Sequence, residues 1–489
     1  MRQVKDQQFQ LGETPISQIR FDPRSRDDIP QLLKGLQYIY VTPEIRKQVF
    51  DILEAMIPQG VNRENGRPGM GLWKILVLGT LRLNLDWDYD RLHEMANHHR
   101  NIRQMLGHGI ADDDHTYNLQ TLKDNIGWLT VEILDKINRV VVSAGHTVLK
   151  KKDARLRGKC DSFVVETDVH YPTDINLLFD AIRKTITLIA GLCDEHNLPG
   201  YRQSAYNIRR IKRLFRKIQQ AKRSTSNDAQ KKEKQDKAIL CAHQSYIEEV
   251  SLYLQRVGET LATMTAQGVS PGELAEIGQY MTHARRQIDQ IKRRVVDKAE
   301  IPHAEKVFSI FEPHTEWISK GKAGVPVELG LKVCIMEDQY GFILHHRVMQ
   351  KQTDDQVTVV MVKETQARFP GLKICSFDKG FHSPANQQEL KGLLDLPVLP
   401  RKGRLSQEMR EFECSEPFVS TRRQHSAVES GINALEVHGL DICPDHGIQG
   451  FTCYVALAVV ARNIQKLGSI IQKQEARRQK QLGKRKMAA

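Results

Sequence analysis

The feature that most constrains the fold is a long helical stretch set between two segments with strand character. Across residues 175–305 the apolar side chains recur at alternating spacings of three and four, which places each stripe on one helix face. A break at residues 267–272 contains Gly and Pro and predicts a turn between two helices. We therefore expect an antiparallel, coiled-coil-like helical bundle at 175–305, inserted into a domain built around a sheet.

Strand character lies on both sides of the predicted bundle. Before it, SFVVETDVHYP is short, rich in β-branched and aromatic residues, and ended by Pro172, as expected of a buried strand. After it, VPVELGLKVCIMED and FILHHRVM flank a Gln-Tyr-Gly turn and predict a β-hairpin. A helix at 354–368, the strands LKICSF and LPVLP, and helices at 421–435 and 450–472 are expected to follow. These patterns predict an α/β mixed-sheet domain made of residues 161–174 and 306–470.

The two ends of the chain have different sequence patterns. Helices are expected at 71–83, 88–96, 99–106 and 116–142, after one that begins at Thr42-Pro43, where Thr42 can cap and Pro43 suits the first turn. Residues 1–160 thus predict an N-terminal all-helical domain, which is compatible with helix-turn-helix DNA binding. Residues 471–489 hold seven Lys and Arg against one Glu and predict a basic, disordered tail.

The charge balance favours a polyanion as partner. The 489 residues include 72 Lys and Arg against 59 Asp and Glu, a net charge of +13, and nucleic acid is the commonest polyanion. Residues 201–240 hold thirteen Lys and Arg against three acids, which indicates either a solvated helix face or contact with a DNA backbone. The eight Cys include no CxxC pair, which argues against a disulfide framework or a zinc finger and fits a reducing cytosol. No apolar stretch approaches the roughly 20 residues that span a bilayer, so no membrane partner is expected.

Three acidic residues lie where strand and helix ends can bring them together. Asp168 lies toward the end of the first strand, Asp378 directly follows LKICSF, and Glu429 lies in the helix predicted at 421–435. Mg²⁺ prefers oxygen ligands and is typically bound by one or two carboxylates plus substrate phosphates. Two such ions, about 3.5–4 Å apart, stabilise both the attacking and the leaving oxygen of a phosphoryl displacement. Taken singly, each acid has a simpler explanation as a helix cap, a turn residue or a surface carboxylate.

Other residues compete for this role. Glu166 shares a strand face with Asp168 and can replace it in the constellation. A histidine-based site would draw on five histidines, but no HExxH, GxSxG or paired His/Cys spacing occurs. These are His170, His345, His346, His382 and His425. The adjacent pair among them, His345 and His346, point to opposite faces of a strand and make a poor chelating pair.

At these residues the sequence resembles bacterial insertion-sequence transposases of the DDE class. The matching segments are TDVHYPTD, FDKGFHS, and RQHSAVESGINALEVHGLD continuing into GFTCYVALAVVARNIQKLG. LWKILVLGTLRLNLDWDYDRL also resembles the N-terminal helical domain of the family. The resemblance covers about two-thirds of the chain and implies a ribonuclease-H-like catalytic domain. In it, Asp168, Asp378 and Glu429 match the catalytic, metal-binding Asp, Asp and Glu, which hold two Mg²⁺ or Mn²⁺ ions.

The resemblance implies metal-dependent DNA strand cleavage and strand transfer at the ends of an insertion element. The expected partners are double-stranded DNA, with terminal inverted repeats and target DNA, and a second copy of the chain in a homodimer on DNA. The expected location is cytoplasmic and nucleoid-associated. The heptad helices supply either the dimer interface or their own intramolecular core. Candidates to neutralise phosphates near the cut, or else solvated surface residues, are Lys379, Arg401, Lys402, Arg404, Arg422, Arg423 and His425.

Two features depart from the family pattern. The helical insertion puts far more chain between Asp168 and Asp378 than lies between Asp378 and Glu429. Some relatives carry a Tyr, an Arg and a Lys around the Glu, where this chain has Arg422, His425 and Glu436, so that version of the site is not expected.

Two other functions remain open. A ribonuclease-H-like nuclease without strand transfer would use the same three carboxylates. A domesticated DNA-binding protein would keep the fold but no longer cut, and retention of all three acids argues against it.

Overall fold

The computed structural model divides the chain into two compact units. The first comprises residues 1–168 and 318–489, and the second comprises residues 169–317. The expected insertion at 175–305 therefore falls inside the second unit. The structure describes residues 3–4, 12–22, 24–57, 69–109, 114–149, 155–223, 228–319, 326–404 and 406–488. Residue 489 of the expected tail lies outside this part of the chain.

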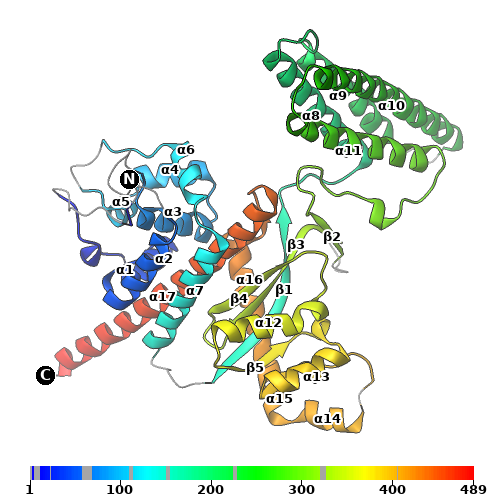
Figure 1. Ribbon diagram of the computed structural model, residues 1–489. Coiled ribbons are helices and arrows are strands. Elements are labelled where there is room, and N and C mark those ends of the chain that lie inside the picture. Colours follow the sequence, from blue (N-terminus) through cyan, green and yellow to red (C-terminus); the bar gives the residue numbers. More distant parts are fainter. Residues whose placement is uncertain are drawn as a thin grey trace. The chain divides into compact units, whose positions relative to one another are not determined.

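A seven-stranded mixed sheet organises the first unit (Figure 1). Its strands run in the order β2-β3-β1-β5-β6, with β4 paired to β3 and β7 paired to β1. β1 is antiparallel to β3 and parallel to β5, and β5 is parallel to β6. The strands are β1 (Leu156–Thr167), β2 (Glu316–Ser319), β3 (Val327–Asp338), β4 (Ile343–Met349), β5 (Leu372–Phe377), β6 (Leu396–Val398) and β7 (Ile442–Cys443). The fold of this unit is mixed α/β, and the predicted hairpin is β3 and β4.

Helices lie on both faces of this sheet. α12 (Asp354–Arg368) packs on β3 and β4, and its bounds are those predicted. α16 (Ala427–Leu435) packs on β1. Successive strand side chains alternate between faces, and on β1 Ser162 meets α12 while Lys159 faces the side of α16. The remaining helices of this half are α13 (Pro384–Leu393), α14 (Gln407–Cys414) and α15 (Glu416–His425).

The N-terminal helices share a core with the sheet. Buried residues of both belong to one hydrophobic cluster, so the expected separate domain at 1–160 is part of the same compact unit. The helices are α1 (Ile29–Val41), α2 (Pro43–Glu54), α3 (Leu72–Asn84), α4 (Tyr89–His98), α5 (Arg100–Met105), α6 (Leu119–Ile126) and α7 (Val131–Val148). The single helix predicted at 116–142 is two helices, because the chain turns after Ile126 and Thr130 caps α7 through the Ile133 N–H.

The long C-terminal helix α17 (Gly447–Ala488) joins these parts by packing against α1, α3 and α7. A Cβ on Gly468 would come within 1.9 Å of the Gln31 carbonyl oxygen, so glycine permits the close crossing with α1. The tail predicted to be disordered from residue 471 is helical through Ala488, because its Lys, Arg, Gln and Ala continue the helix. Over Gly447–Gln481 this helix is long and apolar enough to cross a membrane, but 61% of its most apolar window is buried in the structure.

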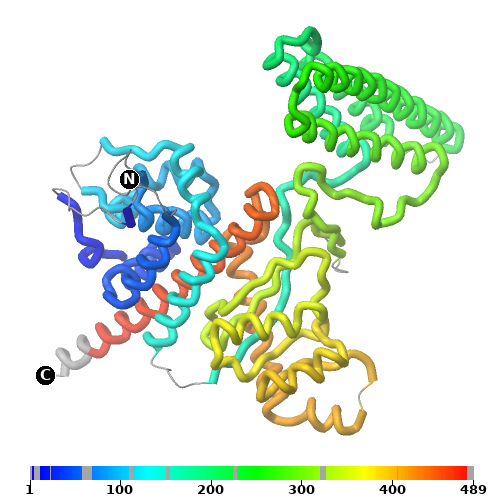
Figure 2. Tube along the Cα trace, in the orientation of Figure 1, coloured from blue at the N-terminus to red at the C-terminus, as the bar shows by residue number. Residues whose placement is uncertain are grey.

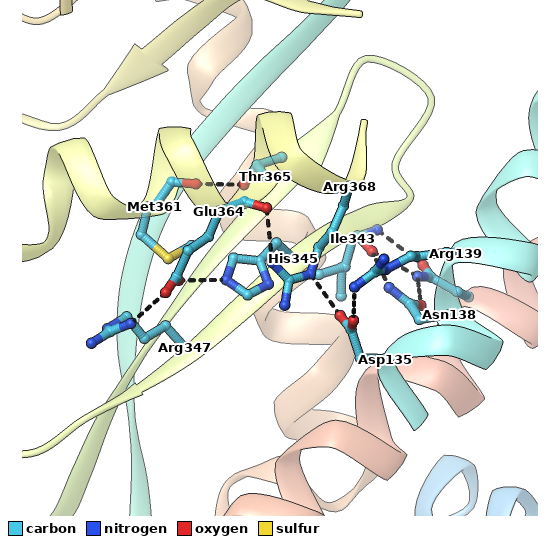
Figure 3. Close-up of polar contacts among 11 residues, drawn as sticks. Asp135, Asn138, Arg139, Ile343, His345, Arg347, Met361, Glu364, Thr365 and Arg368 are labelled. Carbon is cyan, nitrogen blue, oxygen red and sulfur yellow. Dashed lines mark hydrogen bonds and ion pairs between the residues drawn. The ribbon is translucent and has the colours of Figure 1, made fainter. Parts of the chain in front are cut away.

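A polar seam connects α7 to β4 and α12 (Figure 3). Arg368 Nε donates to Asp135 Oδ1 at 2.7 Å, and Asn138 Nδ2 donates to the Ile343 carbonyl at 3.1 Å. Glu364 accepts from Arg347 and contacts His345 Nε2 at 2.9 Å. The pKa of the neighbouring His346 is lowered to about 3 by its own burial and by the charge of His345, while the charge of Asp135 acts to raise it. His346 is therefore neutral in the folded chain.

Lowering the pH should reduce the free energy of unfolding through His346, which lies beside this seam. Because the pKa of His346 is lower in the folded than in the unfolded chain, stability is lost as pH falls below about 6.5. Between pH 7.5 and 5, we expect urea unfolding to show that His346→Gln loses about 2 kcal/mol less stability than the wild type. His98→Gln, on the exposed side of α4, is the matched control. Equal losses in all three chains would contradict this account.

The second unit is a helical bundle with its own core. Its helices are α8 (Asp174–Glu195), α9 (Ser204–Lys222), α10 (Ala229–Ala266) and α11 (Pro271–Val295), and the predicted turn lies between the last two. Ser270 and Glu273 form a capping box at the start of α11. The heptad stripes are buried inside the unit through residues such as Ile218, Val257 and Ile288, so they form an intramolecular core.

Candidate functional site

The strand pairing of β1 with β5 brings two carboxylates side by side. Cys160 of β1 pairs with Phe377 of β5 in parallel register, so the next residues, Asp161 and Asp378, occupy adjacent positions. β5 ends at Phe377, and Asp378 is the exposed, extended residue that precedes the short 3-10 turn η3 (Lys379–Phe381). Asp161 lies within β1 and is half-buried.

The third acid, Glu429, lies in the first turn of α16, beside β1. A buried ion pair fixes this approach, with Lys159 Nζ 2.6 Å from Glu337 Oε1. A Cβ on Gly431 would lie 2.1 Å from Glu337 Oε2, so any larger residue there would displace the Glu337 carboxylate or the helix. The backbone of the helix that carries Glu429 is thus seated on the same strand that carries Asp161.

The charges of these acids interact, as the pKa of Asp161 shows. The pKa of Asp161 is raised to about 6, first by burial and then by the charges of Asp378, Asp354 and Glu429, while the Ser162 N–H partly offsets the shift. That N–H donates to Asp161 Oδ1 at 2.8 Å. Among the described residues, no ion pair neutralises Asp161, Asp378 or Glu429.

Two lysines beside the site are paired with other acids. Lys159 is bound to Glu337, and Lys332 Nζ lies 3.0 Å from Asp354 Oδ2. Asp354, at the start of α12, also accepts a hydrogen bond from the Ser162 hydroxyl at 2.7 Å. Asp354 is therefore a paired neighbour of the site, whereas Asp161, Asp378 and Glu429 form an acidic triad whose charge is not balanced by an ion pair.

The structure places Asp168 apart from this triad, and its role as the first acid stays a prediction. Asp168 is an exposed residue just beyond β1, where its N–H donates to the Cys443 carbonyl at 3.3 Å. It is seven residues past Asp161, which along a strand is roughly 23 Å. Glu166, the alternative, is five residues past Asp161, and its backbone N–H donates to the Asp441 carbonyl.

Asp161 is the acid that the sequence patterns do not single out. The predicted strand SFVVETDVHYP starts one residue after it, whereas β1 begins at Leu156 and places this carboxylate in its middle. The register with β5, which the sequence does not specify, then decides which acid of β1 faces Asp378.

His425 lies among the acids at the end of α15. Its Nδ1 is 3.0 Å from the Ser376 hydroxyl on β5, and burial lowers its pKa while Asp378 and Glu429 act in the opposite direction. Its Nε2 is buried without a hydrogen-bond partner among the described residues. The charges of Asp378 and Glu429 act on this ring, so His425 lies close to two of the three acids.

The remaining predicted basic residues lie on two segments. Arg422 and Arg423 are exposed on α15, and Lys379 is exposed directly after Asp378. After β6, Lys402 Nζ donates to the Gly380 carbonyl at 3.1 Å, and the Arg401 N–H donates to Glu413 at 3.0 Å. Arg404 is exposed beyond them. Lys402 is thereby connected to the turn that follows Asp378.

The donor set of the triad suits a hard divalent cation. All its ligand atoms are carboxylate oxygens, and a positive ion there would relieve the repulsion that raises the pKa of Asp161. Within the described ranges, no three His, Cys, Asp or Glu side chains lie close enough together to hold one ion. Mg²⁺ needs only one or two protein carboxylates, with water and substrate phosphates completing its shell.

Comparisons with known proteins returned no match among family models, curated proteins or solved structures.

Removing the charge of Asp161 should stabilise the chain in the absence of divalent cations. Because its pKa is higher in the folded than in the unfolded state, stability falls as pH rises from about 4 to 6. We expect Asp161→Asn to gain roughly 1–3 kcal/mol at pH 8, a gain that shrinks toward pH 5, where wild-type Asp161 is protonated. Thermal melts in EDTA at several pH values measure this.

The exposed Asp168 provides the matched control. Asp168→Asn should leave the melting temperature nearly unchanged at every pH, because its side chain is exposed beyond the strand. If the two variants gave the same pH profile, the electrostatic triad would be wrong.

Proposed function

We propose that this chain is a DDE transposase, which cuts and joins DNA by metal-dependent phosphoryl transfer. The observation that carries the proposal is the acidic triad of Asp161, Asp378 and Glu429, held by β1, the end of β5 and α16. The order of elements supports a ribonuclease-H-like catalytic domain: a strand with Asp161, a hairpin, a strand followed by Asp378, and a helix with Glu429. The assignment keeps two of the acids expected from the sequence and replaces Asp168 by Asp161.

The chemistry follows from what the triad can hold. Two Mg²⁺ or Mn²⁺ ions bound by these carboxylates would stabilise the attacking and leaving oxygens of an in-line displacement. Water would attack a phosphodiester at the element end and release a 3′-hydroxyl, and that hydroxyl would attack a phosphodiester of target DNA. Basic side chains of the protein would orient the phosphate. Lys379, Arg422 and His425 are the candidates nearest to the triad in sequence or in structure. Asp161 must lose its proton before it can act as a ligand.

The DNA partners are proposed from charge. The net charge of +13 and the basic segment at 201–240, on α9 and the start of α10, suit the phosphates of double-stranded DNA. Terminal inverted repeats and target DNA would be the two substrates, bound by a homodimer that holds two ends together. The heptad stripes are buried within the second unit, so the dimer interface would use other surfaces. A cytoplasmic, nucleoid-associated location is part of the same proposal.

Strand transfer distinguishes this proposal from its nearest alternative. A nuclease built on the same carboxylates would nick or cut DNA but leave no joined product. A domesticated DNA-binding protein would bind the same DNA and release neither product. A supercoiled plasmid that carries the DNA flanking the coding region, incubated with Mg²⁺ or Mn²⁺, reports cleavage and joining in one assay.

Substitutions in the triad provide the decisive comparison. Asp161→Asn, Asp378→Asn and Glu429→Gln should each lower cleavage by roughly a thousandfold or more, because each removes several kcal/mol of transition-state stabilisation. Asp168→Asn, on the same strand segment but outside the triad, should cut within about threefold of the wild type. Circular dichroism and melting temperature establish that each variant is folded. Cleavage that survives Asp161→Asn, or that is abolished by Asp168→Asn, would refute the assignment.

A further inference from the structure

The helical unit contains a cavity of 870 Å³ that the proposed reaction does not use. It lies where the start of α8, the ends of α9 and α11, and the segment after α11 meet, and Figure 2 traces that segment as it leaves α11. All of its lining residues belong to residues 169–317, and the last of them, Trp317, lies on β2. Its size is that of a small-ligand pocket.

One part of the lining is cationic. Lys222, Arg294, Lys298 and Lys306 face two acids, Asp174 and Glu300. Arg294 is paired with Asp174 at 2.9 Å, whereas the three lysines have no ion-pair partner in the part of the chain that the structure describes. Partial desolvation and the charge of Arg294 lower the pKa of Lys222, against the effect of Asp174. An anion in the cavity would offset both effects.

Another part of the lining is an aromatic wall. The rings of Tyr171 and Trp317 lie 5.8 Å apart in an edge-to-face contact and those of Phe308 and Trp317 lie 5.6 Å apart, so the three form one aromatic cluster. Tyr171 is 60% exposed, and Phe308 and Trp317 are only half-buried. Their accessible faces are available for stacking against a flat ring.

Part of the cavity lining is fastened to α11. Gln290 Nε2 donates to the Glu305 carbonyl at 2.8 Å, and Arg293 binds the Glu305 carboxylate at 2.6 Å, which fastens the segment after α11 to that helix. Lys298, on the same segment, has a φ of 54°, a left-handed conformation that costs energy in a residue with a Cβ. Lys298 lines the cavity and has no ion-pair partner among the described residues.

We propose that this cavity binds a nucleotide unit, with its phosphate near the lysines and Arg294 and its base on the Tyr171, Phe308 and Trp317 wall. The combination of cations and stacking rings is the chemistry that recognises a single nucleotide. An intact duplex hides its base faces and would leave the aromatic wall without a role. An unpaired nucleotide of a DNA strand and a free mononucleotide present the same groups. The inference does not depend on the acidic triad.

Calorimetric titration of the full chain in EDTA tests the proposal without any cleavage. The probes are deoxyadenosine 5′-monophosphate, deoxyadenosine, inorganic phosphate, a short single-stranded oligonucleotide, and a duplex of the same sequence. We expect the monophosphate or the single strand to bind more tightly than deoxyadenosine, inorganic phosphate and the duplex. Binding of the monophosphate identifies a free nucleotide as ligand, and binding of the single strand alone identifies an unpaired nucleotide.

Variants separate the pocket from general basicity. Trp317→Leu should weaken binding by about ten- to a hundredfold through lost stacking, and Lys222→Ala should weaken it about tenfold and flatten its salt dependence. Tyr206→Leu and Lys217→Ala, exposed residues of α9 outside the cavity, are the matched controls and should stay within about twofold of the wild type. Equal binding of duplex and single strand, equal binding of phosphate and monophosphate, or equal losses in the controls would overturn the proposal.

Discussion

The parallel pairing of β1 with β5 is the constraint on which the candidate site depends. It aligns Asp161 with the residue that ends β5, and the antiparallel pairing on the other side of β1 brings Glu337 to Lys159. That ion pair is buried beneath Gly431, so the position of α16 and its Glu429 follows from the same strand. A buried ion pair of this kind contributes little net stability, but removing one partner is strongly destabilising. Its main effect is therefore to fix the position of the elements around it.

The site concentrates negative charge that the neighbouring lysines leave unbalanced. Lys159 and Lys332 sit beside it, yet each is bound to a different acid, Glu337 or Asp354. Repulsion among ionised groups in a partly desolvated position is unfavourable in the folded chain. A protein retains such an arrangement when the charge serves a purpose, and oxygen ligands for a divalent cation are the purpose that these groups suit best.

Local patterns predicted much of this architecture. The hairpin of β3 and β4, the strand β5, the helix α12 and the bundle of α8 to α11 all have clear periodicity or turn residues, and Asp378 and Glu429 follow from their places on such elements. Local patterns do not decide between Asp161 and Asp168, because that choice depends on register with a strand more than two hundred residues away. The shared core of the N-terminal helices was missed for a related reason, since it depends on packing around α17, whereas the tail is helical because it continues α17.

Because β1 and β3 are neighbours in the sheet but flank the whole helical unit in the chain, β1 leaves the ribosome long before any of its partners exists. The bundle has its own hydrophobic core and can fold in that interval. At its base the rings of Tyr171 and Trp317 meet, so a folded bundle returns the chain close to the point where β1 ended. The entropy of closing so large a loop is then lost during bundle formation, and the unpaired edges of β1 are exposed to other nascent chains for a shorter time.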